Sequence, residues 1–208
     1  METQPPELKA AADVILAEIR ARMRDGKRPF LVALDGGSGA GKSTLGGMIA
    51  QDLNAAFVQS DDFYDARIPD AQWDSRTTQQ KVADVIDWRR LRADALEPLL
   101  AGNVARWHPF DFERRRPDGT YPLSETYVER QPANVIILDG AYSSRPELSD
   151  LIDLSVLVDV PLAVRHARLD ARESADCLAG WHRRWDEAEA YYFTQVRPPS
   201  SFDLIINL

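Results

Sequence analysis

The sequence predicts a three-layer α/β domain built on a central, mostly parallel five-stranded sheet. Two observations predict this class: short apolar runs alternate with helical patterns, and each run is apolar almost throughout. Such alternation is typical of α/β domains, and near-continuous apolar strands are required in a parallel sheet that is buried on both faces. The predicted strands are 30–34, 55–58, 134–138, 154–158 and 202–206. The predicted connecting helices are 43–53, 88–101, 161–173 and 179–194.

A further helix is expected before the first strand. Apolar residues recur at close to helical spacing over 7–24, so this helix would pack on one face of the sheet. The chain has 208 residues, of which 44% are hydrophobic, and nothing in it separates two cores. We therefore expect residues 1–208 to form one domain.

Two long stretches, 64–86 and 103–132, do not fit the alternation of strands and helices. Long irregular connections in compact domains are usually functional or disordered. Because open α/β sheets bind ligands at the carboxyl ends of their strands, we expect these stretches to be insertions on the substrate side.

A complete G-x-x-x-x-G-K-[ST] motif lies between the first predicted strand and the next helix, at Gly36–Ser43. In such a loop, backbone N–H groups and the helix N-terminus hold phosphate, the lysine reaches the terminal phosphates and the hydroxyl binds Mg²⁺. This predicts a P-loop NTPase fold that binds a nucleoside triphosphate. The residues predicted to bind the nucleotide are Gly37, Ser38, Gly39, Ala40, Gly41, Lys42, Ser43 and Thr44.

Carboxylates end two of the predicted strands. Asp61 and Asp62 follow the second strand, and Asp139 follows the third. At the carboxyl edge of the sheet, one of them could accept a proton from an attacking hydroxyl and help to hold Mg²⁺. The alternative for each is a capping or turn role.

Arginines at 165, 168 and 172 share one face of the helix predicted over 161–173. They could close over the nucleotide as a lid and offset the charge of the transferred phosphoryl group, or they could form a solvated face. The other arginine cluster, Arg114–Arg116, could bind an anionic group or be solvated. His166 and His182 are expected to be surface residues of helices rather than ligands, and the role of His108 is open. No His or Cys spacing suggests a transition-metal site.

The composition of the chain limits the kinds of partner and location that we expect. The formal net charge of −8 argues against a general nucleic-acid binder, because such binding depends on an excess of Lys and Arg. The first residues lack the features of a signal peptide, and no apolar stretch has membrane-spanning length. With one cysteine in the chain, we expect a cytoplasmic protein that does not bind membranes.

Together these motifs resemble the uridine kinase and phosphoribulokinase family of P-loop kinases. Beside the Gly36–Thr44 loop, three elements carry the resemblance: Asp61-Asp62-Phe63-Tyr64 is similar to D-x-F-Y, Phe110-Asp111-Phe112 to Y-D-F, and Ile137-Leu138-Asp139-Gly140 to I-L-E-G. Val158-Asp159 followed by the three arginines also matches.

The resemblance implies an ATP- and Mg²⁺-dependent kinase that phosphorylates a hydroxyl of a small metabolite. It implies that Asp61 is the base, that Ser43, Asp61 and Asp139 hold Mg²⁺, and that Lys42, Arg165 and Arg168 take part in catalysis, with Arg168 and Arg172 also on the nucleotide. The residues expected near the acceptor are Asp62, Tyr64, Asp84 or Asp87, Phe110 and Arg115.

Two departures from the family pattern concern the acceptor. The family tyrosine is replaced by Phe110, and Arg115 stands where uridine kinases carry a histidine that reads the pyrimidine. A guanidinium suits a carboxylate or phosphate, so an anionic acceptor such as a sugar phosphate, hydroxy acid or pantothenate-like compound is the alternative. A nucleotide-dependent switch is less consistent with the sequence, because the chain has neither an [NT]-K-x-D nor an L-S-G-G-Q motif.

Overall fold

The computed structural model describes residues 5–23, 29–172 and 175–208, without the side chains of 172, 175–179, 181 and 183. Its centre is a five-stranded sheet in the order β2-β5-β1-β6-β7, and all four pairings are parallel. The strands are β1 Phe30–Asp35, β2 Ala56–Gln59, β5 Val135–Asp139, β6 Leu154–Asp159 and β7 Leu204–Asn207. The predicted sheet is therefore confirmed. Most of the strand ends differ from the predicted ones by one or two residues.

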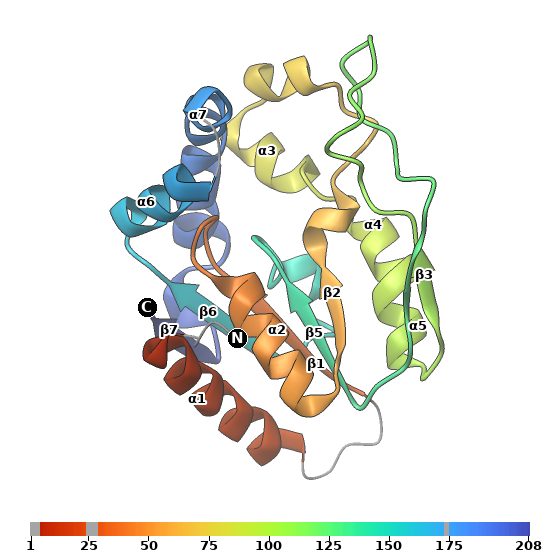
Figure 1. The fold of residues 1–208 in the computed structure, drawn as a ribbon, viewed down its shortest axis with the longest axis vertical. Coiled ribbons are helices and arrows are strands. Elements are labelled where there is room, and N and C mark those ends of the chain that lie inside the picture. Colours follow the sequence, from red (N-terminus) through yellow and green to blue (C-terminus); the bar gives the residue numbers. More distant parts are fainter. Residues whose placement is uncertain (1–4, 24–28, 173–174) are drawn as a thin grey trace.

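Alternate residues of the central strands face two separate cores. Val32 and Leu34 of β1 pack in the core beneath α1 (Pro6–Arg22) and α2 (Lys42–Leu53), which lie together in Figure 1. Leu31 points the other way, into the second core. Because both faces of β1 are covered, its apolar run is continuous, as a buried parallel strand requires.

The opposite face of the sheet is covered by the remaining longer helices. One is α3 (Thr78–Asp84). A second helix is continuous through α4 (Trp88–Arg90), a π-helical segment (Leu91–Leu96) and α5 (Glu97–Leu100). The third is α7 (Ala175–Tyr191), which ends in a π-helical turn (Tyr192–Val196). The helix α6 (Leu162–Arg172) follows β6 and contacts α7 beside the phosphate loop (Figure 1).

The two stretches predicted as irregular contain ordered elements. The first holds a 3₁₀ helix (Asp70–Ser75) and α3, whose start is fixed by a capping box between Thr77 and Gln80. The second holds an antiparallel pair, β3 (Ala105–Trp107) and β4 (Val128–Arg130). The Asp70 N–H donates to the Gly119 carbonyl at 3.0 Å, so the two stretches meet.

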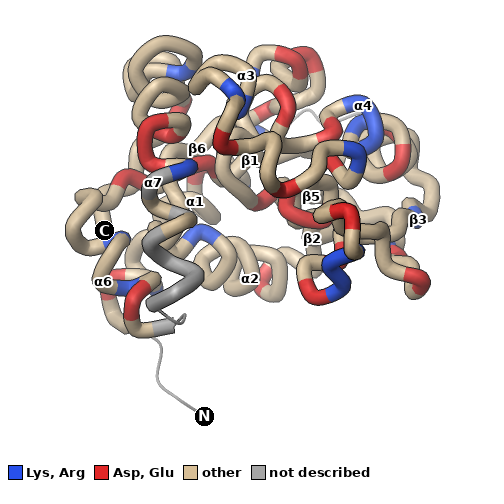
Figure 2. Tube along the Cα trace, turned by 90° about the horizontal axis from the view of Figure 1, so that it is seen from above, with Lys and Arg blue, Asp and Glu red and all other residues tan. Residues whose placement is uncertain are grey.

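Charged residues of both signs occur throughout the fold. In the view of Figure 2, Lys and Arg lie among Asp and Glu in most parts of the described chain. In the part of the chain that the structure describes, no helix is long and apolar enough to cross a membrane. The assignment of the whole chain to one domain stays a prediction.

Candidate active site

The sheet topology brings three functional segments together. The phosphate loop follows β1, Asp139 ends β5, and Asp61 follows β2. Since β5 lies between β1 and β2 and the strands are parallel, all three segments emerge at one edge of the sheet. This is the edge at which ligands of α/β sheets bind.

The phosphate loop leads directly into the N-terminus of α2, as the motif predicted. Gly41 adopts a left-handed conformation, with φ of 89°, and α2 begins at Lys42. A Cβ on Gly39 would lie 2.6 Å from the backbone oxygen of Arg165, so only glycine allows α6 to approach so closely. Lys42 is buried and its Nζ donates to the Gly37 carbonyl at 3.0 Å.

A buried aspartate that the sequence analysis missed holds the base of the loop. The Asp35 carboxylate accepts hydrogen bonds from the N–H groups of Gly36, Tyr142 and Ser144 and from the Tyr192 hydroxyl, at 2.8 to 2.9 Å. Burial raises the pKa of Asp35, and the hydrogen bonds from Ser144, Tyr192 and Gly36 oppose the rise. A carboxylate at the end of an apolar strand was the available signal.

Asp139 has the environment of a metal ligand. It is 3% exposed, and burial raises its pKa, while the Lys42 charge and a hydrogen bond with the Ser43 side chain oppose the rise. Its Oδ1 is buried and has no hydrogen-bond partner among the described residues. A buried, unpaired carboxylate oxygen beside a hydroxyl fits Mg²⁺, which prefers oxygen ligands.

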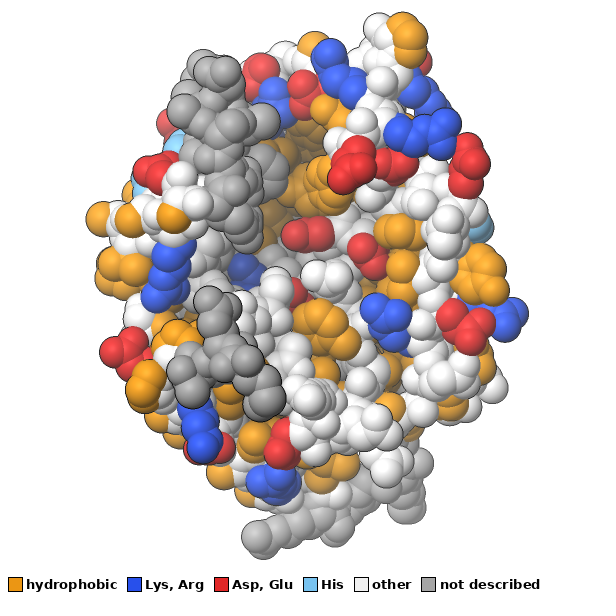
Figure 3. Space-filling view, viewed as in Figure 1, with side chains coloured by type: hydrophobic (Ala, Val, Ile, Leu, Met, Phe, Trp, Pro, Cys, Tyr) orange, Lys and Arg blue, Asp and Glu red, His pale blue; other side chains and the backbone are white. Residues whose placement is uncertain are grey.

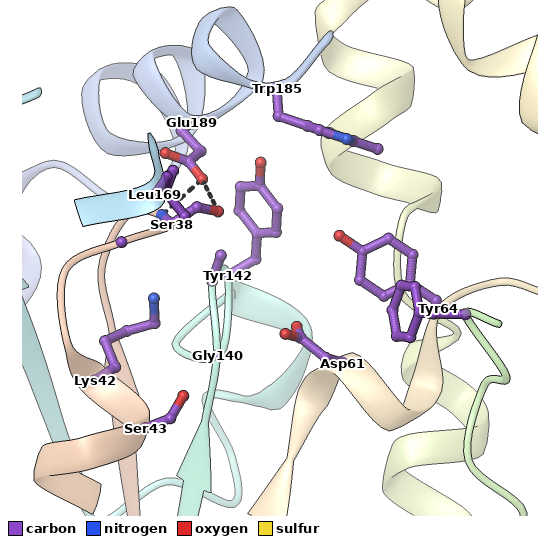
Figure 4. A pocket seen from close by; sticks show the side chains of 13 residues that line it. Ser38, Lys42, Ser43, Asp61, Tyr64, Gly140, Tyr142, Leu169, Trp185 and Glu189 are labelled. Carbon is purple, nitrogen blue, oxygen red and sulfur yellow. Dashed lines mark hydrogen bonds between the residues drawn. The ribbon is translucent and has the colours of Figure 1, made fainter. Parts of the chain in front are cut away.

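Asp61 and Asp62 are held differently, although they are neighbours in a 3₁₀ helix (Ser60–Phe63). Asp61 lines the cavity in front of the phosphate loop, where Figure 4 shows its carboxylate opposite Lys42 and Ser43. The Asp62 carboxylate instead accepts a hydrogen bond from the Trp107 indole at 2.7 Å, and burial raises its pKa.

The arginines of α6 reach the phosphate loop. Arg165 Nη1 donates to the Ser38 carbonyl at 2.9 Å, and Arg168 Nη1 donates to the Ala40 carbonyl at 3.2 Å. The two side chains therefore lie against the loop. Arg172 ends α6, and its side chain lies outside the described residues.

Glu189 of α7 is a further residue of the site. One oxygen accepts hydrogen bonds from the Ser38 N–H at 2.8 Å and the Ser38 hydroxyl at 2.6 Å. The other forms an ion pair with Arg165 at 2.7 Å, and the two side chains are 4% and 13% exposed. No sequence motif marks this glutamate, because it comes from a helical stretch rich in acidic residues.

These groups surround a cavity of about 410 Å³. Figure 4 shows Lys42 and Ser43 on one side, Asp61 and Tyr64 on the other, and Trp185 and Glu189 entering from α7. Figure 3 shows a hollow on this face in which hydrophobic side chains lie beside acidic ones. The lining residues are Ser38, Gly39, Lys42, Ser43, Asp61, Tyr64, Phe112, Gly140, Ala141, Tyr142, Leu169, Trp185 and Glu189.

Several residues predicted near the acceptor do not line this cavity. Asp84 pairs with Arg76, and Asp87 caps the helix that begins at Trp88 and lies 3.3 Å from Arg67. Both line a separate depression.

Arg115 and Phe110, also predicted near the acceptor, lie outside the cavity as well, as does Asp62. Arg115 is exposed in a third depression beside Arg114 and Arg116. Phe110 packs at an angle against the rings of Tyr64 and Phe112, at centroid distances of 5.6 and 4.6 Å. Contact of these three residues with an acceptor stays a prediction.

The chain is similar in sequence to known kinases. It is 28% identical over 178 residues to the uridine kinase of Clostridium botulinum (strain Langeland), covering 83% of this chain and 80% of the relative. No protein-family model matches the chain. The chain is a kinase that is similar to the uridine kinases.

Solved structures agree with the fold of the kinase. A possible uridine kinase from Bacillus stearothermophilus superposes with a TM-score of 0.69 at 19% identity, over 96% of this chain and 99% of the other. D-glycerate 3-kinase from Cryptococcus neoformans superposes with a TM-score of 0.65 at 14% identity, over 98% and 96%. Together with the sequence relatives, this likeness in fold supports a small-molecule kinase, and P-loop kinases imply a nucleotide substrate.

Proposed function

We propose that the kinase transfers the γ-phosphoryl group of ATP, with Mg²⁺, to a hydroxyl of a neutral, nucleoside-like metabolite, with uridine as the first compound to test. One observation carries this proposal. The cavity that begins at the phosphate loop continues past Asp61 to the aromatic side chains of Tyr64 and Trp185 (Figure 4). Phe112 also lines it.

The charges of the cavity favour a neutral acceptor. Among its described lining residues, Lys42 is the only basic one, and it belongs to the phosphate end. Asp61 and Glu189 would repel an anion that entered beside them. Aromatic rings instead suit a planar base, since stacking of a base on an aromatic side chain contributes about 1–3 kcal/mol.

The proposed chemistry uses groups that line the cavity, Lys42, Ser43 and Asp61, together with Arg165 and Asp139. Asp61 accepts the proton of the acceptor hydroxyl, whose oxygen attacks the γ-phosphorus as the bond to the β-phosphate oxygen breaks. Lys42 and Arg165 would offset the negative charge of the transferred group. Ser43 and Asp139 would hold Mg²⁺, which would help to neutralise the negative charge of the phosphates.

The arginine cluster supports a second candidate, an anionic acceptor. Arg115 is exposed in a depression lined by two further arginines, and a guanidinium binds carboxylate or phosphate well. An acceptor bound there would have to reach Asp61 through a movement of the 103–132 stretch.

Steady-state kinetics with matched variants separate the two candidates. We expect uridine to be phosphorylated with a higher kcat/KM than sugar phosphates or hydroxy acids. Phe112→Ala should raise the KM for uridine about five-fold or more, the effect of losing about 1 kcal/mol of stacking. Tyr127→Ala is the control, because Tyr127 is equally exposed (52% against 51%) but does not line the cavity.

The same kinetics can also refute the proposal. Preference for an anionic acceptor, with a KM that rises in Arg115→Ala and not in Phe112→Ala, would refute the neutral acceptor. Replacing ATP by GTP in the same assay tests the nucleotide, for which we expect ATP to be preferred.

A further inference from the structure

The two helices beside the phosphate loop each carry a histidine and an aspartate four residues apart. In α6 the pair is His166 and Asp170, and in α7 it is His182 and Asp186. Residues four apart lie on the same face of a helix. From the sequence, both histidines are expected to be surface residues of helices. The two pairs come from different helices and form no ligand spacing along the chain.

The structure brings the two pairs together. The imidazole rings of His166 and His182 lie 3.9 Å apart, and His166 Nε2 lies 3.0 Å from Asp186 Oδ2. Ligand atoms of His166, His182 and Asp186 all lie within 4.8 Å of one another. All three residues are partly buried, so the cluster lies between the helices rather than free in solvent.

His182 lacks the hydrogen bonds that a buried imidazole normally makes. Neither of its ring nitrogens has a hydrogen-bond partner among the described residues. Nδ1 lies 3.8 Å from Asp186 and Nε2 lies 3.7 Å from Asp170, and both distances exceed that of a hydrogen bond. Unpaired buried polar groups are costly, so this cluster needs a further partner.

A metal ion would supply that partner. Ligand atoms bound to tetrahedral Zn²⁺ at 2.0–2.2 Å lie about 3.3 Å from one another, so small side-chain shifts from the observed spacings are sufficient. Imidazole and carboxylate are ligands of zinc and similar transition metals. A histidine ligand usually donates its other N–H to a carboxylate, and Asp170 faces His182 Nε2.

We propose that His166, His182 and Asp186 form a binding site for a divalent transition metal, with Zn²⁺ as the ion to test, and that Asp170 orients His182. Bound metal would link α6 to α7. These helices also carry Arg165 and Glu189, so the site would fix both relative to the phosphate loop. This site is separate from the Mg²⁺ site proposed at Ser43 and Asp139.

The test is a calorimetric titration of tag-free, metal-depleted protein with ZnCl₂, in the presence of excess Mg²⁺ to occupy the nucleotide site. We expect one Zn²⁺ per chain. His182→Asn and Asp186→Asn should each weaken binding by at least about ten-fold, and Asp170→Asn by about 10- to 100-fold. His108→Asn is the matched control, because His108 is the remaining histidine of the three and lies in another part of the fold.

Cobalt spectroscopy provides a readout that does not depend on activity. Wild-type protein with CoCl₂ should show the visible absorption of tetrahedral Co²⁺, and His182→Asn should lose it while its melting curve without metal shows a folded protein. Equal Zn²⁺ affinity in wild type, His182→Asn and Asp186→Asn would overturn the proposal. So would binding that depends on Cys177 or on His108 instead.

Discussion

Replacing Glu189 by Gln should destabilise the protein and at the same time strengthen nucleotide binding. Arg165 is only 13% exposed, so this substitution leaves its guanidinium largely buried without the charge of its partner. Removal of one partner of a buried ion pair costs about 3–5 kcal/mol. Since Gln keeps an oxygen that can accept from Ser38, we expect about 3 kcal/mol, which lowers the Tm of a domain of this size by about 6–12 °C.

The effect on nucleotide affinity has the opposite sign. The Ser38 N–H and the Arg165 guanidinium, which now donate to Glu189, are groups that would hold phosphate. Two like unit charges about 4 Å apart repel by about 1 kcal/mol even in water. Loss of the carboxylate charge should therefore lower the Kd for ATP by about five-fold or more.

Thermal unfolding and calorimetric ATP titration measure both effects on the same samples. Glu187→Gln is the control, since Glu187 lies in the same helix but is exposed, and it should change neither quantity. An unchanged Tm, or ATP affinity that falls together with stability, would show that Glu189 does not compete for the phosphate-binding groups.

Three further predictions concern the reaction centre. Lys42→Ala should lose phosphoryl transfer and ATP affinity while a melting curve shows a folded protein; unchanged turnover would exclude the loop from the mechanism. Asp61→Asn should lower kcat by about 10²- to 10⁴-fold, as loss of a general base does, and should change the affinity for ATP by no more than a few-fold. Asp62→Asn should lower kcat less, because the Asp62 carboxylate binds the Trp107 indole. If Asp62→Asn has the larger effect, the roles of the two aspartates must be exchanged. Asp139→Asn should raise Tm at neutral pH but abolish Mg²⁺-dependent activity. Burial raises the pKa of Asp139 in the folded state, so the wild-type protein loses stability as the pH rises through that pKa. The Tm difference between Asp139→Asn and wild type should therefore grow from about pH 4 upward. A Tm difference that is independent of pH would contradict this prediction.

The sheet and the phosphate loop could be predicted because local sequence determines them. A strand buried on both faces, such as β1 or β5, has a continuous apolar run, and the loop motif is contiguous. By contrast, β3 and β4 have three residues each and include charged side chains, so no apolar pattern marks them.

The remaining parts of the site depend on contacts between distant residues. Glu189 meets Ser38 across 151 positions of the chain, and no local pattern encodes that contact. Arg115 can be assigned to the acceptor only from its offset after Phe110. It is exposed in a separate depression, and its contact with an acceptor stays a prediction. The pairing of His166 with His182 likewise follows from the packing of two helices.

The strand order also has a consequence for the synthesis of the protein. The central strand β1 pairs with β5 and β6, which leave the ribosome about 100 to 125 residues after it. At about 5–20 residues per second, β1 waits roughly 5 to 25 s for its second neighbour. During that interval its apolar residues lack their sheet partners, and α1 and α2, made just before and after it, are the segments available to shield them.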